Sequence, residues 1–290
     1  MANSIQLAKV YTNLLDEVYK QSALTAVLES DASLARQGAN ANEIIIPKLS
    51  MDGLADYSRN SGYVNGDVTL NWETVQFNYE RGRMFSVDNM DNEETQNIAF
   101  GRLAGEFIRT KVVPELDAFR FAKYASVVGA GTATGALATG ADVIAALRTA
   151  TSAMDESEVP MEDRHFFITP TLMGLVEDMD TTKSKEVLAR FASITKVPQT
   201  RFYSAIELLD GKSSGEEKGG YKKADGGVEL NFEIIHKPAT LQFTKHAVPK
   251  VISPELNQDA DAWKYGYRNY GLCDTYENKA AGIYVHKKSV

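Results

Sequence analysis

The sequence predicts a mixed α+β fold, and three observations support that class. Apolar residues recur at helical spacing near residues 7–28, 91–126 and 141–155, which predicts long amphipathic helices. Alternating and β-branched apolar runs in residues 43–79 predict an antiparallel hairpin. The chain returns to β-type runs in residues 228–286, after a middle part in which helix and strand patterns alternate.

The first helical pattern runs through Leu7, Val10 and Leu14 and continues to Leu28. Such an apolar stripe has to be buried against another surface, because its exposure to water is unfavourable. Two explanations stay open at this point. The segment is either part of the subunit's own core or an arm that packs on a neighbouring subunit.

The hairpin begins with the β-branched run Glu43–Pro47, and its proline is typical of an edge strand. Glycine, asparagine and aspartate in residues 50–66 predict turns, and a second strand starts at Val68. The apolar residues of that strand change parity near Glu73, which moves them to the opposite face and predicts a bulge or a strong twist. A hairpin of this length is not stable alone, so we expect it to need a partner surface.

The long helix at 91–126 begins with acidic residues, which are favourable at a helix N-terminus. Pro114 lies inside it and predicts a kink or a break. The glycine-rich residues 129–140 predict a linker. Beyond it we predict helices at 141–155, 171–179 and 183–194, an exposed loop at 211–227, and strands at 165–169, 228–235, 240–243, 248–252, 262–268 and 282–286.

No pattern of chemistry-bearing residues points to an enzyme. A chain of 290 residues can bury a large core without covalent cross-links, and its single cysteine, Cys273, excludes an internal disulfide and a cysteine-based zinc site. The 4 histidines lack metal-ligand spacing, and the glycines of 129–135 lack the spacing of a dinucleotide fingerprint. We therefore predict no catalytic residue, no cofactor and no metal site, and a structural role.

The formal net charge of −8 bears on possible partners. Lysine and arginine never gather beyond pairs, so we expect only weak, non-specific and salt-sensitive contact with DNA. The longest uncharged stretch, residues 124–141, contains 4 glycines, and we do not expect it to cross a membrane.

Several longer motifs carry a resemblance to a known family. The motifs are Leu15–Tyr19, Ile44–Lys48, Gly53–Asn60, Gly62–Asp67, Glu80–Asp88, Glu106–Lys111, Val113–Arg120 and Tyr276–Lys287. With these motifs the sequence resembles the major capsid proteins of tailed bacteriophages of Gram-positive bacteria, whose fold is the Hong Kong 97 type.

The resemblance implies a division of the chain into four parts. They are an N-terminal arm (1–38), an extended hairpin loop across a neighbouring subunit (39–88), a peripheral domain with a long spine helix (89–135 and 237–277), and an axial domain (136–236 and 278–290).

It also implies a function. The chain would assemble into the pentamers and hexamers of an icosahedral phage head that encloses double-stranded DNA. It would be made in the bacterial cytoplasm and reside in the virion, without a membrane partner. Two alternatives remain: an encapsulin-like shell around a protein cargo, and a soluble α/β enzyme or ligand-binding protein.

Two departures from some relatives refine the expected partners. The arm and hairpin begin almost at Met1, so we expect scaffolding from a separate protein, together with a portal. The only lysine in residues 39–88 is Lys48, near the base of the hairpin, so we expect no covalent cross-link between subunits.

Three arginines are candidate assembly contacts. Arg59, Arg81 and Arg83 lie on or beside the hairpin, and we expect them to meet acidic groups of a neighbouring subunit. The proposed acidic partners are Asp91, Glu93 and Glu94 at the start of the long helix. The alternative is that the arginines are solvated surface charges, each worth less than about 1 kcal/mol.

Overall fold

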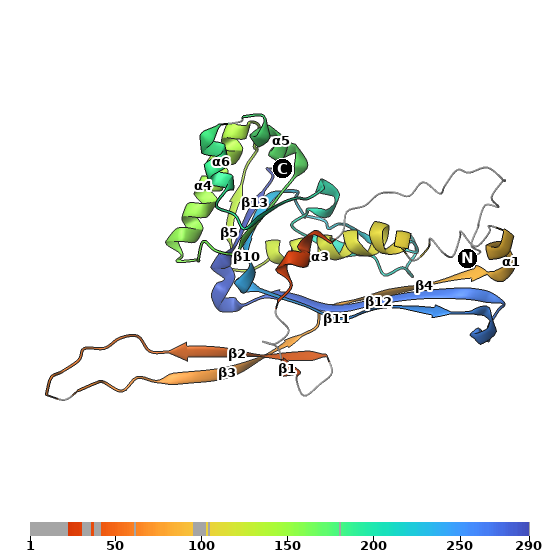
Figure 1. Cartoon of the computed structure of the whole chain (residues 1–290), viewed down its shortest axis with the longest axis horizontal. Coiled ribbons are helices and arrows are strands. Elements are labelled where there is room, and N and C mark those ends of the chain that lie inside the picture. Colours follow the sequence, from red (N-terminus) through yellow and green to blue (C-terminus); the bar gives the residue numbers. More distant parts are fainter. Residues whose placement is uncertain are drawn as a thin grey trace.

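The computed structural model describes residues 23–30, 36–37, 42–60, 62–94, 103, 105–179 and 181–289. The predictions for residues 1–22, 31–35 and 38 of the arm and for 95–102 and 104 of the long helix lie outside these residues. Figure 1 shows a body of two sheets, with one helix running along them and a hairpin projecting from one end.

One sheet, here called the central sheet, has the strand order β5-β13-β10-β6-β7. Its strands are β5 (Gly131–Thr134), β6 (Arg164–Ile168), β7 (Ser193–Lys196), β10 (Leu230–His236) and β13 (Ile283–Lys287). β6 with β7 and β13 with β5 are parallel pairs, and the other pairs are antiparallel.

The middle strand β10 is buried along its whole length because helices cover both faces of the central sheet. On one face, Phe232 and Ile234 pack among helices α4 (Gly140–Glu156), α5 (Pro170–Glu177) and α6 (Thr182–Leu188). On the other face, Ile235 packs against α3 (Val113–Ala125). β10 is therefore a strand between two helical layers, and its polar residues Asn231 and Glu233 are buried with its apolar ones.

The second sheet, here called the long sheet, has the order β11-β12-β4. It consists of β4 (Tyr79–Asp88), β11 (Thr240–Ile252) and β12 (Ala262–Thr275), all antiparallel, with a bulge between Thr244 and His246. The helix α3 lies along one of its faces (Figure 1). The strands predicted at 240–243 and 248–252 are thus one strand with a bulge.

The long helix passes through Pro114 without a break. Residues 105–107 are helical, Ile108–Val112 form a π-helical turn, and α3 follows with Pro114 in its first turn. A proline lacks the N–H that an α-helix needs in its interior, and a wide turn just before it removes that requirement. The predicted kink or break is therefore replaced by a change of helical pitch.

The hairpin is built by β2 (Glu43–Met51) and β3 (Val68–Gln76), with the short β1 (Arg36–Gln37) beside β2. The second strand ends at Gln76, and β4 starts only at Tyr79, in the long sheet. The small α1 (Asn89–Glu94) follows β4. The hairpin points away from the body of the molecule (Figure 1).

Three local predictions need correction. The helix predicted at 183–194 is shorter, since it ends at Leu188 and β7 joins the central sheet beside β6. The linker predicted at 129–140 contains β5, and the loop predicted at 211–227 contains β9 (Tyr221–Lys223), paired with β8 (Ile206–Leu208). Each of these short strands is stabilised by pairing with another strand, which local patterns do not reveal. The described residues also form short 3₁₀ helices at Leu24–Leu28, Gln199–Arg201, Lys237–Ala239, Pro254–Leu256 and Glu277–Gly282.

Candidate assembly surface

The base of the hairpin is anchored to its own chain. Ile44 and Ile46 of β2 are 7% and 4% exposed, and they pack with Leu241, Phe243 and Leu272 of the long sheet. These three residues lie on the face of the sheet that is turned away from α3, because Cys273, next to Leu272, is packed in the cluster that contains α3. The hairpin base therefore covers one end of that face.

Farther out, the apolar residues of the hairpin are on its other face and are exposed to a large degree. Val68, Leu70 and Trp72 are 65%, 52% and 47% exposed, and they share one side of β3 because side chains alternate along a strand. Met51 stands opposite Val68 in the register and is also exposed. The apolar residues of β3 thus do change face near Glu73, but the predicted bulge is absent, because the pairing of β2 with β3 keeps one register through this point.

The outermost part of the hairpin is closed by a small second turn. Ser58 and Gly62 form a two-way backbone bridge, and the rings of Tyr57 and Tyr63 meet edge to face with centroids 4.8 Å apart. Leu54 is fully exposed beside them. Three carboxylates in this region, those of Asp52, Asp56 and Asp67, outnumber the single guanidinium of Arg59. The end of the hairpin therefore carries exposed apolar side chains and an excess of negative charge.

The face of the long sheet that the hairpin base covers continues beyond it as an uncovered surface. Lys250, Gly266 and Met84 stand in one row across its three strands, and Met84 is 53% exposed. Arg268 in the neighbouring row pairs with Glu80, and the ammonium group of Lys245 lies 5.1 Å from the centre of the Phe77 ring. This surface, which we call the open sheet face, combines apolar and basic side chains.

Two of the predicted arginines have partners within the chain. Arg81 Nε is 2.7 Å from Glu115 Oε1 of α3, and Arg81 Nη2 donates to the carbonyl of Leu209 at 2.7 Å. Arg83 donates to the carbonyls of Glu217 and Lys218 at 2.9 and 3.0 Å. Sequence reasoning missed Glu115 as the partner of Arg81, because 34 residues separate the two.

The other predicted contact residues lie at the two extremes of the molecule. Arg59 is exposed in the turn at the end of the hairpin, and Asp91, Glu93 and Glu94 are in α1. Their contact with a neighbouring subunit stays a prediction, as does any such contact of Arg81 and Arg83.

A buried polar network fixes the segment 24–30 to the body. The carboxylate of Asp117 accepts hydrogen bonds from the N–H groups of Leu24 and Thr25, from the Thr25 hydroxyl at 2.8 Å and from Arg201 at 3.0 Å. Burial raises the pKa of the Asp117 carboxyl, and these donors act in the opposite direction. Gln242 completes the anchorage by donating to the Thr25 carbonyl at 2.8 Å.

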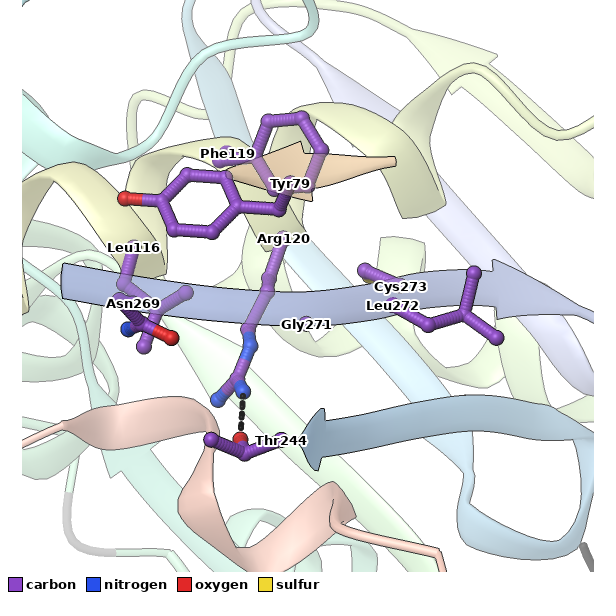
Figure 2. Close-up of a pocket in the computed structure, with 9 residues that line it drawn as sticks. All are labelled: Tyr79, Leu116, Phe119, Arg120, Thr244, Asn269, Gly271, Leu272 and Cys273. Carbon is purple, nitrogen blue, oxygen red and sulfur yellow. Dashed lines mark hydrogen bonds between the residues drawn. The ribbon is translucent and has the colours of Figure 1, made fainter. Parts of the chain in front are cut away.

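A small pocket lies between α3 and the long sheet (Figure 2). Arg120 reaches through it toward Thr244, whose hydroxyl is 3.4 Å from Nη2, and the free room is about that of one water molecule. Burial raises the pKa of the adjacent Cys273 thiol to about 12, so this thiol is a buried hydrophobic group and not a nucleophile. The pocket is therefore a packing feature.

The described residues contain no grouping of three or more histidine, cysteine, aspartate or glutamate side chains arranged to hold a metal ion. Within the same part of the chain, no helix has the length and apolar character needed to cross a bilayer.

No protein-family model and no curated protein matches the sequence. Solved structures match nearly the whole chain. A structure from Mycobacterium phage Che8 has a TM-score of 0.64 at 13% identity and covers 98% of each chain. The mature capsid of bacteriophage PhiM1 has a TM-score of 0.64 at 11% identity, covering 100% of this chain and 92% of the other. A virus-like particle from Pyrococcus furiosus has a TM-score of 0.53 at 12% identity, covering 91% and 96%.

These matches extend over both sheets, the long helix and the projecting hairpin, and they agree with the motifs that carry the sequence resemblance. The chain has the Hong Kong 97-type fold of tailed-phage capsid proteins.

Proposed function

We propose that this chain is the major capsid protein of a tailed phage, and that it assembles through pentamers and hexamers into an icosahedral head around double-stranded DNA. The observation that carries the proposal is the hairpin. Its base is buried on its own chain, and its outer half presents Val68, Leu70 and Trp72 to solvent on the opposite face. A contiguous exposed apolar surface on a projecting element is typical of a protein interface.

The open sheet face of a second copy is the surface that complements this hairpin. The hairpin end is apolar and carries Asp52, Asp56 and Asp67, and the open sheet face is apolar and carries Lys245, Lys250 and Arg268. Opposite charges on two apolar surfaces favour one docking orientation over others. Because the hairpin and its complement are different surfaces, the contact is head-to-tail, and head-to-tail contacts generate rings.

The four parts expected from the resemblance supply the rest of the proposal. Residues 39–88 serve as the extended loop, 89–135 with 237–277 as the peripheral domain, and 136–236 with 278–290 as the axial domain around the symmetry axes. Residues 1–38 serve as an arm. A separate scaffolding protein and a portal take part in assembly, and the packaged DNA is contacted weakly. The protein has no catalytic function in this proposal, and it works in the virion.

The test is the assembly state of the purified chain, expressed in bacteria and followed by size-exclusion chromatography and electron microscopy. We expect rings of subunits or closed shells of megadalton size. A chain that stays a monomer or a small oligomer at all concentrations contradicts the proposal and favours the enzyme or ligand-binding alternative.

A pair of matched variants then tests the hairpin. Replacing Leu70 and Trp72 by serine should leave the melting temperature of the isolated subunit nearly unchanged and raise the concentration needed for assembly. The control replaces Thr69 and Asn71, the exposed polar residues on either side of Leu70, by serine, and it should assemble like the parent chain.

A shell around a protein cargo is the second candidate, because the Pyrococcus furiosus virus-like particle also shares the fold. The contents of particles isolated from their natural source distinguish the two. Nuclease-resistant DNA supports the phage head, and a packaged enzyme supports the nanocompartment.

A further inference from the structure

The loop of residues 209–220 joins β8 to β9, in the part of the chain between β7 and β10 of the central sheet, and it contacts β4 of the long sheet. Its two ends are held together by the bond from the Leu209 N–H to the Gly220 carbonyl at 2.9 Å. On one side, Ile206 and Leu208 of β8 pack on the core that includes α3 and the central sheet. On the other side, the loop meets β4 of the long sheet through arginine side chains.

Arg81 and Arg83 of β4 make that second contact. Their guanidinium groups donate to four backbone carbonyls of the loop, those of Leu209, Glu217, Lys218 and Gly220. The two arginines have a fixed spacing because they lie on one strand. The loop therefore has to hold one conformation for all four carbonyls to accept their hydrogen bonds. Arg81 also pairs with Glu115, so its position is set by α3.

The neck of the loop is shaped to admit Arg83. Gly211 and Gly219 both have positive φ, at 73° and 64°, which glycine adopts readily and other residues do not. A Cβ atom on Gly219 would lie 2.9 Å from Arg83 Nη1, and one on Gly211 would lie 3.4 Å away. The guanidinium therefore lies across the neck of the loop, close to the backbone of Gly219.

The loop is also ordered from within. The carboxylate of Asp210 accepts from the N–H groups of Lys212 and Ser213 at 2.7 and 2.8 Å and from the Ser213 hydroxyl, and Glu216 accepts from the Asp210 N–H at 3.0 Å. These bonds lower the pKa of Asp210 to about 2. A loop with this internal bonding is held in one conformation.

A buried ion pair holds the chain segment that precedes the loop. Arg201, only 2% exposed, pairs with the fully buried Asp117 of α3 at 3.0 Å. The segment of residues 199–223, between β7 and β10 of the central sheet, is therefore bound to α3 through Asp117 and to β4 through Arg81 and Arg83. Elsewhere the chain passes between the two sheets only through the segments 126–130, 237–239 and 276–282 among the described residues.

We infer that the 209–220 loop is a clasp that fixes the angle between the central sheet and the long sheet, and that it thereby sets the curvature of the shell. The inference rests on the proposed function. In a closed shell, each subunit meets some neighbours through the hairpin and long sheet and others through the central sheet. The angle between the two sheets then determines the curvature that each subunit gives to the shell, and a single angle gives a single particle diameter.

The test compares particle diameters by cryo-electron microscopy for the parent chain and for Arg83→Ala. This change removes two bonds to the clasp without leaving a buried carboxylate unpaired. A second variant replaces residues 210–219 by Asn-Gly, a turn that closes the β8–β9 hairpin. The control is Arg148→Ala, at an exposed arginine of α4. Hydrogen exchange and melting of dissociated subunits show whether each variant is folded.

We expect both clasp variants to lose the single particle size and to give shells and open sheets of mixed curvature, while the control keeps the parent diameter. The inference is overturned if both variants form shells of the parent diameter in parent yield. If the Arg83 variant does not fold, the turn replacement decides. Failure of the proposed function looks different, because the parent chain itself then forms no shells.

Discussion

The side-chain amide of Asn78 pairs with both peptide groups of Cys273, 195 residues away. Its Nδ2 donates to the Cys273 carbonyl at 2.7 Å, and its Oδ1 accepts from the Cys273 N–H at 3.1 Å. Asn78 lies between the end of β3 and the start of β4, where the backbone leaves the hairpin. The amide therefore takes the place of a strand residue beside β12 and attaches the hairpin to the body.

Replacing Asn78 by alanine should lower the free energy of unfolding by about 1–3 kcal/mol, because two peptide groups of a buried strand lose their partners. Urea unfolding of the dissociated subunit measures this change. The matched control is Asn71→Ala on the exposed hairpin, which should cost less than about 0.5 kcal/mol. Equal effects of the two changes would show that the Asn78 bonds do not anchor the hairpin.

Replacing Asp117 by alanine should destabilise the subunit by about 3–5 kcal/mol, because it leaves the buried guanidinium of Arg201 without its partner. The comparison is Glu177→Ala, which breaks the exposed pair of Glu177 and Lys196 at 2.8 Å and should cost less than about 1 kcal/mol. Unfolding curves for the two variants give the difference. A small loss for Asp117→Ala would mean that the network around Thr25 holds the segment 24–30 without it.

The stability of the subunit should fall as the pH rises, through Glu233. This side chain is fully buried in β10, and neither of its carboxyl oxygens has a hydrogen-bond partner among the described residues. Burial raises its pKa well above the ordinary value. The folded chain therefore keeps a proton that the unfolded chain loses, and stability is complete below the unfolded pKa of about 4.3 and decreases toward the folded pKa.

The Glu233→Gln variant lacks that proton equilibrium, so it should gain stability relative to the parent by up to about 1.4 kcal/mol per pH unit in this window. Melting between pH 5 and pH 8 or so checks the trend, and Glu156→Gln at the exposed end of α4 is the control. A constant difference between parent and Gln variant across the range would show that Glu233 ionises freely in the folded chain.

Free subunits should bind duplex DNA weakly, with a dissociation constant of about 10⁻⁶ M or weaker at physiological salt. The net charge of −8 repels the phosphate backbone on average, and the basic side chains of the open sheet face are partly paired with carboxylates. A gel-shift titration at two salt concentrations measures this. Tight binding that persists at high salt would contradict it.

The class of the fold and most of its strands could be predicted from periodicity. The runs near Ile234, Tyr265 and Tyr284 each produced the strand that their pattern indicated. Tertiary pairing decided the rest. β5, β7 and β9 are too short and too mixed in composition to be recognised, and each is stabilised by a neighbouring strand.

In the candidate assembly surface, the apolar face of the hairpin could be predicted from the sequence, and the partners of the arginines could not. The parity change near Glu73 is visible in the sequence, and it correctly marked the place where the hairpin changes its apolar face. The partners of Arg81, by contrast, are a glutamate 34 residues away and carbonyls more than 100 residues away. Backbone carbonyls have no residue identity, so no sequence pattern distinguishes an arginine that binds them from an arginine in solvent.

In the proposed assembly, the two apolar faces of the hairpin separate folding from polymerisation. Ile44 and Ile46 contribute to the stability of one molecule, and Leu70 and Trp72, on the reverse side, are the residues that the proposed contact with a second molecule would bury. Substitutions on one side of the hairpin would then change the critical concentration of assembly without changing the buried base. Because every subunit of the proposed shell repeats the same contact, a modest change per contact would decide whether nucleation is spontaneous or depends on a scaffolding protein.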